Sequence, residues 1–184
     1  MISTAPSSPS SAPPPAAPPA LLSRPWRFAV AAGTGVALDQ LSKFLVFHLV
    51  SSSWPLWPEV LHLKPAENPG AAFSLFSSAP WLVLLLTAIA VPLLGWWYAR
   101  VRNTARGAFL WALALLCAGA AGNLVDRLFL GKVRDFIDFV PPLPLIGHWA
   151  TFNFADLFIC VGVGLYLLAE WLPARGKEAA KPAK

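Results

Sequence analysis

The chain has 184 residues, of which 57% are hydrophobic and only 12% are charged. A soluble domain carries about a quarter charged residues, so the composition excludes an ordinary soluble domain and predicts a polytopic membrane protein. Basic residues outnumber acidic ones, 14 against 9, but they lie beside the hydrophobic segments, which argues against a nucleic-acid-binding protein.

The first residues have the composition of a disordered tail. Residues 1–20 are almost only Pro, Ser and Ala, which cannot bury a core. A cleaved signal peptide is not predicted, because the basic start and short apolar core are missing. We therefore expect a disordered tail over residues 1–24, one membrane domain over residues 25–173 and a basic tail over residues 174–184.

Four hydrophobic segments predict four membrane-spanning helices. They cover about residues 26–50, 80–98, 108–130 and 152–172, and a span needs about 20 residues. Pro92 interrupts the second segment, which a membrane helix tolerates when its neighbours satisfy the freed carbonyl. The expected fold is an all-α membrane protein, a four-helix transmembrane bundle.

The basic residues predict the orientation of this bundle. They precede the first hydrophobic segment, fill the short loop between the second and third, and follow the fourth. Cytoplasmic loops carry such an excess of Lys and Arg. Both termini are therefore expected in the cytoplasm, and residues 51–79 and 131–150 on the outer side.

The outer segment between the first and second helices is expected to be rich in β structure. Residues 60–64 and 70–76 are too apolar to float in water, and Pro65, Pro69 and Gly70 break helix between them. We predict short strands that lie against the outer leaflet.

Polar residues in and beside the hydrophobic segments require an explanation, because a carboxylate near hydrocarbon is costly and marks a candidate functional site. Helical spacing places several of them on common faces: Asp39 with Lys43, Asn123 with Asp126 and Arg127, and Asn153 with Asp156. The outer segments add Glu67, Asn68, Asp135 and Asp138. Most of these residues are expected at one depth, near the outer face, where two carboxylates could share a proton and activate a water.

A purely structural interpretation of the helical pairs stays open at this point. Asp39–Lys43 and Asp126–Arg127 each contain their own countercharge and could simply lock helices together. Asn123 could be a hydrogen-bonding residue between helices.

The isolated carboxylates leave further alternatives open. Asp135 and Asp138 could be solvated loop charges, whereas Asp156 has no basic residue close in sequence, which favours a functional role. A proton-coupled transporter or a membrane scaffold is the alternative function. A transporter would need polar residues at both faces and usually internal repeats.

Metal and thiol chemistry are not predicted. The three histidines are scattered without metal-ligand spacing, and Cys117 and Cys160 fall inside hydrophobic segments as packing residues. We expect neither a metal nor a cofactor.

Four blocks, in this order, resemble the lipoprotein signal peptidases (signal peptidase II), bacterial membrane aspartyl peptidases of family A8. They are Leu-Asp-Gln-Leu-Ser-Lys at 38–43, Glu-Asn-Pro-Gly-Ala-Ala-Phe-Ser at 67–74, Gly-Asn-Leu-Val-Asp-Arg at 122–127 with Val-Arg-Asp-Phe at 133–136, and Phe-Asn-Phe-Ala-Asp at 152–156. The likeness covers about residues 27–172. One departure is Ala118-Gly119, where the family often has a Gly pair.

The resemblance implies an aspartic endopeptidase with Asp135 and Asp156 as its catalytic pair. The supporting or substrate-binding residues that it implies are Asp39, Lys43, Asn68, Gly70, Asn123, Asp126, Arg127 and Asn153. The substrate would be a diacylglyceryl-modified prolipoprotein, cut just before the lipidated cysteine. The enzyme would be a monomer in the bacterial inner membrane, in contact with membrane lipid but not nucleic acid, with its active site at the periplasmic face.

Overall fold

The computed structural model describes residues 19–70, 76, 78–142 and 149–171. It contains four long helices, all apolar enough to cross a membrane, and a sheet of three short strands. The helices are α1 (Pro25–Leu49), α2 (Pro80–Val101), α3 (Gly107–Leu130) and α4 (Phe154–Trp171), preceded by the 3-10 turn η1 (Leu21–Ser23). The four predicted membrane spans are thus confirmed.

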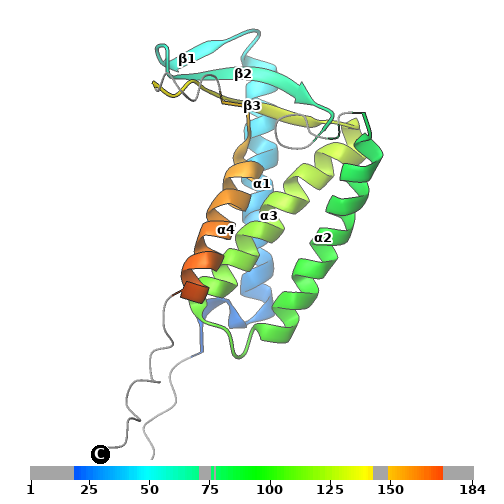
Figure 1. Ribbon diagram of the computed structural model, residues 1–184, viewed down its shortest axis with the longest axis vertical. Helices are drawn as coiled ribbons and strands as arrows, with labels where there is room; N and C mark the ends of the chain where they lie inside the picture. The colour runs from blue at the N-terminus through cyan, green and yellow to red at the C-terminus, as the bar shows by residue number, and fades with distance from the viewer. Residues whose placement is uncertain (1–18, 71–75, 77, 143–148, 172–184) are drawn as a thin grey trace, which may run out of the picture.

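The sheet lies across one end of the helix bundle, as Figure 1 shows, and the described ends of the chain lie at the other. Its strands are β1 (Trp54–Trp57), β2 (Leu61–Asn68) and β3 (Val133–Phe139), antiparallel in the order β1-β2-β3. The strand predicted at residues 60–64 is confirmed within β2. The second predicted strand, at residues 70–76, falls mostly outside the described residues.

The third strand is a difference from the sequence-based expectation. We expected β structure only between the first and second helices, but β3 follows α3 and pairs with β2. Apolar and polar residues do not alternate regularly along β3, and its two aspartates, Asp135 and Asp138, are buried despite their charge. Residue Phe152 continues the pairing on the other side of β3, where it exchanges backbone hydrogen bonds with Ile137.

Local sequence signals explain where the helices begin and end. Pro25 and Pro80 occupy the first turns of α1 and α2, where the missing N–H costs nothing. Helix α3 ends at Gly131, whose φ of 71° is the left-handed conformation that favours glycine. Gly131 therefore ends α3 and begins the turn that leads to β3.

Small residues let α3 pack closely against α1 and α4. A Cβ atom on Gly35 of α1 would lie 2.7 Å from the Cβ of Ala118 in α3. A Cβ atom on Gly119 would likewise collide with the backbone oxygen of Ala155 in α4. The departure at Ala118 is accommodated because the facing residue, Gly35, has no side chain.

The opposite end of the bundle is closed by an apolar cluster. Leu22 of η1 is buried there with Phe28, Tyr98 and Leu110, and Tyr98 donates its hydroxyl to the Leu22 carbonyl at 2.9 Å. The packed part of the chain therefore begins before α1, within the segment assigned to the N-terminal tail.

Candidate active site

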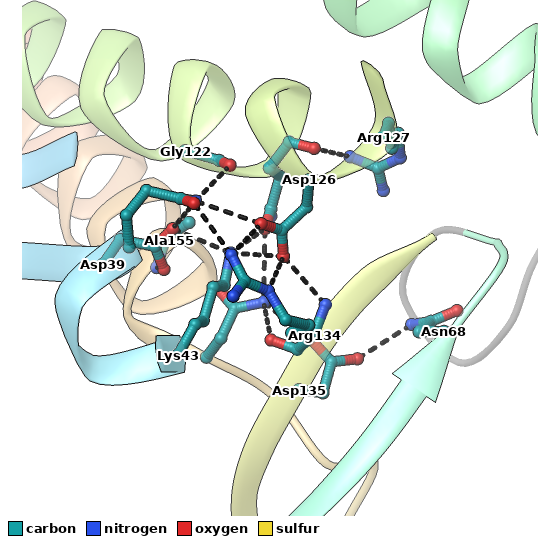
Figure 2. A network of polar contacts seen from close by, with 12 residues as sticks. Asp39, Lys43, Asn68, Gly122, Asp126, Arg127, Arg134, Asp135 and Ala155 are labelled. Carbon is teal, nitrogen blue, oxygen red and sulfur yellow. Dashed lines mark hydrogen bonds and ion pairs between the residues drawn. The ribbon is translucent and has the colours of Figure 1, made fainter. Parts of the chain in front are cut away.

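The polar residues singled out in the sequence converge where the sheet meets the bundle. Asp135 is carried by β3 and Asp156 by the first turn of α4. Figure 2 shows β3 passing beside α1 and α3, so that Asp135 lies next to the buried charges of these helices. Residues more than 100 positions apart in sequence are thereby brought together.

Asp156 is held by a reciprocal capping interaction at the start of α4. The Asp156 amide donates to Asn153 Oδ1 at 3.0 Å, and the Asn153 amide donates to Asp156 Oδ2 at 3.1 Å. This is a capping box, with Asn153 as the N-cap and Asp156 three residues later. The spacing of these two residues thus fixes the carboxylate at the helix N-terminus, where negative charge is favoured.

Asn153 also links Asp156 to Asp135. Its side-chain amide donates to Asp135 Oδ1 at 2.7 Å, while its backbone amide serves Asp156. Asn68 of β2 donates to the other oxygen, Asp135 Oδ2, at 3.0 Å (Figure 2). Each oxygen of Asp135 thus accepts a hydrogen bond from an amide, which fixes the plane of the carboxyl group.

The environment of Asp135 favours its protonated form. The residue is 3% exposed. Burial, and next the nearby Asp156 carboxylate, raise the pKa of Asp135 to about 6, although the Asn68 and Asn153 amides oppose the shift. The Asp135 carboxyl group therefore holds a proton more readily than a free carboxyl group does.

Asn123 is the second residue whose amide group donates a hydrogen bond to Asp156, and contacts to its side-chain oxygen fix its orientation. Its Nδ2 donates to Asp156 Oδ1 at 2.8 Å. Its Oδ1 accepts from Lys43 Nζ at 3.0 Å and from Asn153 Nδ2 at 3.2 Å. Because an ammonium group can only donate, Lys43 holds the oxygen of Asn123 and turns the NH₂ toward Asp156.

Lys43 is fully buried and is neutralised by two carboxylates. Its Nζ lies 2.7 Å from Asp39 Oδ2 and 3.3 Å from Asp126 Oδ2. The other oxygen of Asp39 accepts a hydrogen bond from the backbone amide of Ala155 at 2.9 Å. This amide lies in the first turn of α4, where backbone N–H groups have no partner within the helix. The expected Asp39–Lys43 pair is confirmed, and it joins α1 to both α3 and α4.

The expected Asp126–Arg127 pair is wrong. Asp126 pairs with Arg134 of β3 at 2.7 Å and also accepts the Arg134 backbone amide at 2.9 Å. Neighbouring residues on a helix point about 100° apart, so Asp126 and Arg127 do not face each other. Asp126 faces Lys43 and Arg134 instead, and thereby ties β3 to the bundle (Figure 2).

Arg127 is directed toward β2 and the chain that follows it. Its guanidinium donates to the Gly70 carbonyl at 3.1 Å and to the Asn123 carbonyl at 3.3 Å. The Gly70 amide in turn donates to Asn68 Oδ1 at 2.9 Å. Arg127 and Gly70 therefore position Asn68, whose own amide holds Asp135.

Two residues of this network were missed as site residues. Gln40 donates to the Gly122 carbonyl at 3.0 Å and to Asp126 Oδ1 at 3.1 Å, and accepts from Arg134 Nη2 at 2.8 Å. Both Gln40 and Arg134 stand next to a residue that was identified, inside the same motif blocks. Gly122 is required here, because a Cβ atom on it would lie 2.6 Å from Asp39 Oδ2.

Neither Asp135 nor Asp138 is a solvated loop charge. Asp138 is 6% exposed, accepts from the Thr151 hydroxyl at 3.1 Å, and is paired in register with His62. It does not line the pocket that contains the other two aspartates. The geometry therefore separates Asp138 from the pair formed by Asp135 and Asp156.

A pocket of about 670 Å³ opens at these carboxylates. Its polar end holds Asp135 and Asp156 with Asn68, Asn123 and Arg127. Its apolar wall runs along the membrane-spanning helices and includes Val83, Leu86, Ala90, Ala120, Leu157 and Ile159. Among the described residues, no group of three or more His, Cys, Asp or Glu could hold a metal ion. The pocket therefore suits an amphiphilic substrate, with carboxylates at its polar end.

Comparisons with known proteins agree with this arrangement. The family model described as signal peptidase (SPase) II matches residues 31–172. A lipoprotein signal peptidase of Gloeothece citriformis is 38% identical over 157 residues, covering 82% of this chain and 92% of the relative. A lipoprotein signal peptidase of Syntrophotalea carbinolica is 39% identical over 142 residues, covering 74% of this chain and 85% of the relative.

The fold is also similar to that of solved proteins. The structure of a bacterial membrane enzyme superposes with a TM-score of 0.73 and 26% identity, covering 90% of this chain and 98% of the other. The structure of a second bacterial membrane enzyme superposes with a TM-score of 0.68 and 25% sequence identity, covering 85% of this chain and 97% of the other. The four-helix bundle and its sheet are therefore shared with solved membrane enzymes.

Proposed function

Because this chain belongs to the signal peptidase II family, it is a protease that removes signal peptides from prolipoproteins, and we propose that it does so as an aspartic peptidase. Asp135 and Asp156 are the proposed catalytic pair. One observation carries this proposal: Asn153 donates to both carboxylates, at the polar end of a pocket whose wall is apolar.

The pair would share one proton, because two adjacent carboxylates do not both ionise readily. We place the proton on Asp135, since its pKa is raised to about 6 and Asp156 lies at a helix N-terminus. Ionised Asp156 takes a proton from water, whose oxygen attacks the scissile carbonyl carbon. Asp135 donates its proton to the carbonyl oxygen, which gives a neutral tetrahedral intermediate.

The second half of the reaction reverses these roles. The intermediate returns a hydroxyl proton to Asp135 as the carbonyl reforms. Asp156 passes its proton to the leaving nitrogen, and the C–N bond breaks. The products are a signal peptide with a new carboxyl end and a lipoprotein with a free amino group. The pair returns to its starting protonation state, with no metal or cofactor in any step.

The substrate enters from the membrane in this proposal. The apolar wall of the pocket is formed by residues of the membrane-spanning helices α2, α3 and α4 and suits the acyl chains of a diacylglyceryl cysteine. Burial of acyl chains contributes about 0.8 kcal/mol per CH₂ group. The lipid would anchor the cysteine so that the peptide bond just before it lies between the two carboxylates.

The orientation follows from charge. The sheet and the proposed catalytic pair lie at one end of the bundle, and the arginines of residues 24–27 and 100–106 lie near the other. Such basic segments remain on the cytoplasmic side. We therefore propose cytoplasmic termini and an active site at the periplasmic face of the inner membrane. We also propose that the enzyme acts as a monomer, since the hydrogen-bonded network around Asp135 and Asp156 includes residues from α1, α3, α4 and the sheet of one chain.

The direct test of substrate class uses purified protein in detergent, without a gradient. A diacylglyceryl precursor peptide is compared with the same peptide bearing a free cysteine thiol, and the cut is located by mass spectrometry. We expect cleavage just before the cysteine of the lipidated peptide and a steep loss for the other. Equal rates on both peptides would contradict recognition of the lipid.

A further inference from the structure

A short stretch of chain before α4 pairs with β3 on the side opposite β2. The Phe152 amide donates to the Ile137 carbonyl at 3.0 Å, and the Ile137 amide donates to the Phe152 carbonyl at 2.8 Å. The Trp149 amide donates to the Phe139 carbonyl at 3.1 Å. Residues 149–152, which we call the edge segment, therefore run along the edge of β3 that β2 leaves free.

The main chain of Thr151 is directed away from β3. Successive residues of an extended chain direct their N–H and C=O groups to opposite edges. Both backbone groups of Phe152 are bonded to β3, so those of its neighbour Thr151 face the other edge. Within the part of the chain that the structure describes, no hydrogen bond to the N–H or C=O of Thr151 is present. An unpaired edge of this kind is a template for another extended chain.

The side chain of Thr151 is engaged within the protein and holds the residue in place. Its hydroxyl donates to Asp138 Oδ1 at 3.1 Å, and Asp138 is buried. Two residues later, Asn153 donates to both candidate catalytic carboxylates. Thr151 is thus fixed by its side chain and by its neighbours, which leaves its backbone N–H and C=O for a ligand.

The edge segment forms part of the wall of the candidate active-site pocket. All four of its residues line this pocket, as do Asp135 and Asp156. A chain whose scissile bond lies between the two carboxylates therefore occupies the same pocket as the edge segment. The residue next to that wall with unpaired backbone groups is Thr151.

We propose that Thr151 binds the substrate through its main chain, so that the extended residues before the cut add a strand to the edge segment. This inference rests on the proposed function and states how the same site holds the peptide part of its substrate. A signal peptide that unwinds near the cut loses helical hydrogen bonds, which are costly to leave unmade beside a membrane. Pairing with Thr151 replaces some of them. Strand addition recognises backbone, so it accepts signal peptides of different sequence.

The first test removes single N–H groups from the substrate and leaves the protein unchanged. In a lipidated precursor peptide, the N–H of each residue that precedes the cysteine is replaced, one at a time, by an ester oxygen. One ester should raise KM about tenfold with little change in kcat, because it leaves the Thr151 carbonyl without its donor. The esters at the residues beside it should resemble the parent, since neighbours in an extended chain face opposite edges.

The outcomes of this test separate the inference from the proposed function. A parent peptide that is not cut at all would count against the proposed function itself. If the parent is cut and every ester peptide has the same KM, only the role of Thr151 is overturned. Equal losses at adjacent residues would also overturn it, because a paired strand uses alternate residues.

The second test follows the Thr151 amide in protein labelled with ¹⁵N-threonine. Its exchange with deuterium is measured by NMR in detergent, with and without a lipidated peptide whose scissile bond is a reduced amide. Exchange should slow about tenfold or more when the peptide binds. The control is Thr34, which lies within α1 and should not change. Unchanged exchange at Thr151 would overturn the proposal. Full protection before the peptide is added would also do so, because another part of the chain would then occupy the edge.

Discussion

Lys43 holds the amide oxygen of Asn123 at 3.0 Å from a position with no solvent exposure, and thereby turns the Asn123 NH₂ toward Asp156. A fully buried lysine is costly unless it is paired and hydrogen-bonded. Here the cost is offset by the ion pairs with Asp39 and Asp126, and Lys43 in turn fixes the Asn123 NH₂ group as a hydrogen-bond donor to Asp156. Stability and site geometry therefore depend on the same ammonium group.

Lys43→Met should be strongly destabilising. It leaves Asp39 as a buried carboxylate without its ammonium partner, which costs about 3–5 kcal/mol. It also frees the Asn123 amide to rotate, so kcat should fall in whatever protein folds. The melting temperature in detergent and the yield of folded protein measure the first effect. The matched control is Lys132→Met, since the Lys132–Glu67 pair is exposed and should contribute at most about 1 kcal/mol.

Arg134 and Arg127 should have different effects when replaced by methionine. Arg134→Met removes the partner of buried Asp126 and should lower the melting temperature markedly. Arg127→Met removes hydrogen bonds to two carbonyl groups, and its main effect should be on the kinetics of cleavage through Gly70 and Asn68. If Arg127→Met proved the less stable of the two, the assignment of Asp126 to Arg134 would be contradicted.

The activity should depend on the protonation of Asp135. Because the proposed starting state has Asp135 protonated, kcat/KM should fall as the pH rises through about 6. The measurement is kcat/KM for a lipidated peptide across this range, in one detergent at constant ionic strength. A profile that rises through pH 6 would contradict the assignment of the proton.

Stability should respond to the same group in a defined direction. The folded-state pKa of Asp135 lies above its unfolded value of 3.8, so the native state binds more protons between these values. Stability is therefore lost as pH rises from about 4 to 6, by about 3 kcal/mol at roughly 1.4 kcal/mol per pKa unit. Asp135→Asn should remove this part of the pH dependence, which melting curves at several pH values would show. A variant that keeps the full pH dependence would contradict the shift.

Cys160 provides a direct probe of the apolar wall. Cys160 is one of the residues that line the pocket and is exposed, whereas Cys117 is half-buried. In a Cys117→Ala background, a bound non-cleavable diacylglyceryl peptide should slow the labelling of Cys160 by a small maleimide. The same peptide without lipid is the control. Equal protection by both peptides would mean that the acyl chains do not occupy this wall.

The four helices could be predicted because hydrophobic length decides membrane spans almost alone. The pairing of charges could not, since it depends on which side of each helix faces which neighbour. Asp126 illustrates this limit: its sequence neighbour is Arg127, but its partner is Arg134, which β3 brings from the next segment. Gln40 was missed for a similar reason. An uncharged side chain in a helix does not stand out in the sequence, and the role of Gln40 depends on its contacts with α3 and β3.

The candidate pair was accessible from sequence through motif resemblance, but its geometry was not. Nothing in the segment around Asp135 predicted a strand, because buried carboxylates interrupt the usual alternation of apolar and polar residues. The Asn153–Asp156 spacing suggested a shared helical face, whereas the structure makes it a capping box. Local chemistry therefore fixed Asp156, and tertiary contacts fixed Asp135.

The central claim is that Asp135 and Asp156, and not Asp138, carry out cleavage. The measurement is the rate of release of the signal peptide from a lipidated precursor by Asp135→Asn, Asp156→Asn and Asp138→Asn, each purified to equal folded concentration. The first two variants should lose essentially all turnover, and Asp138→Asn should keep a substantial part of it. Near-normal turnover by Asp135→Asn or Asp156→Asn would contradict the assignment of the pair.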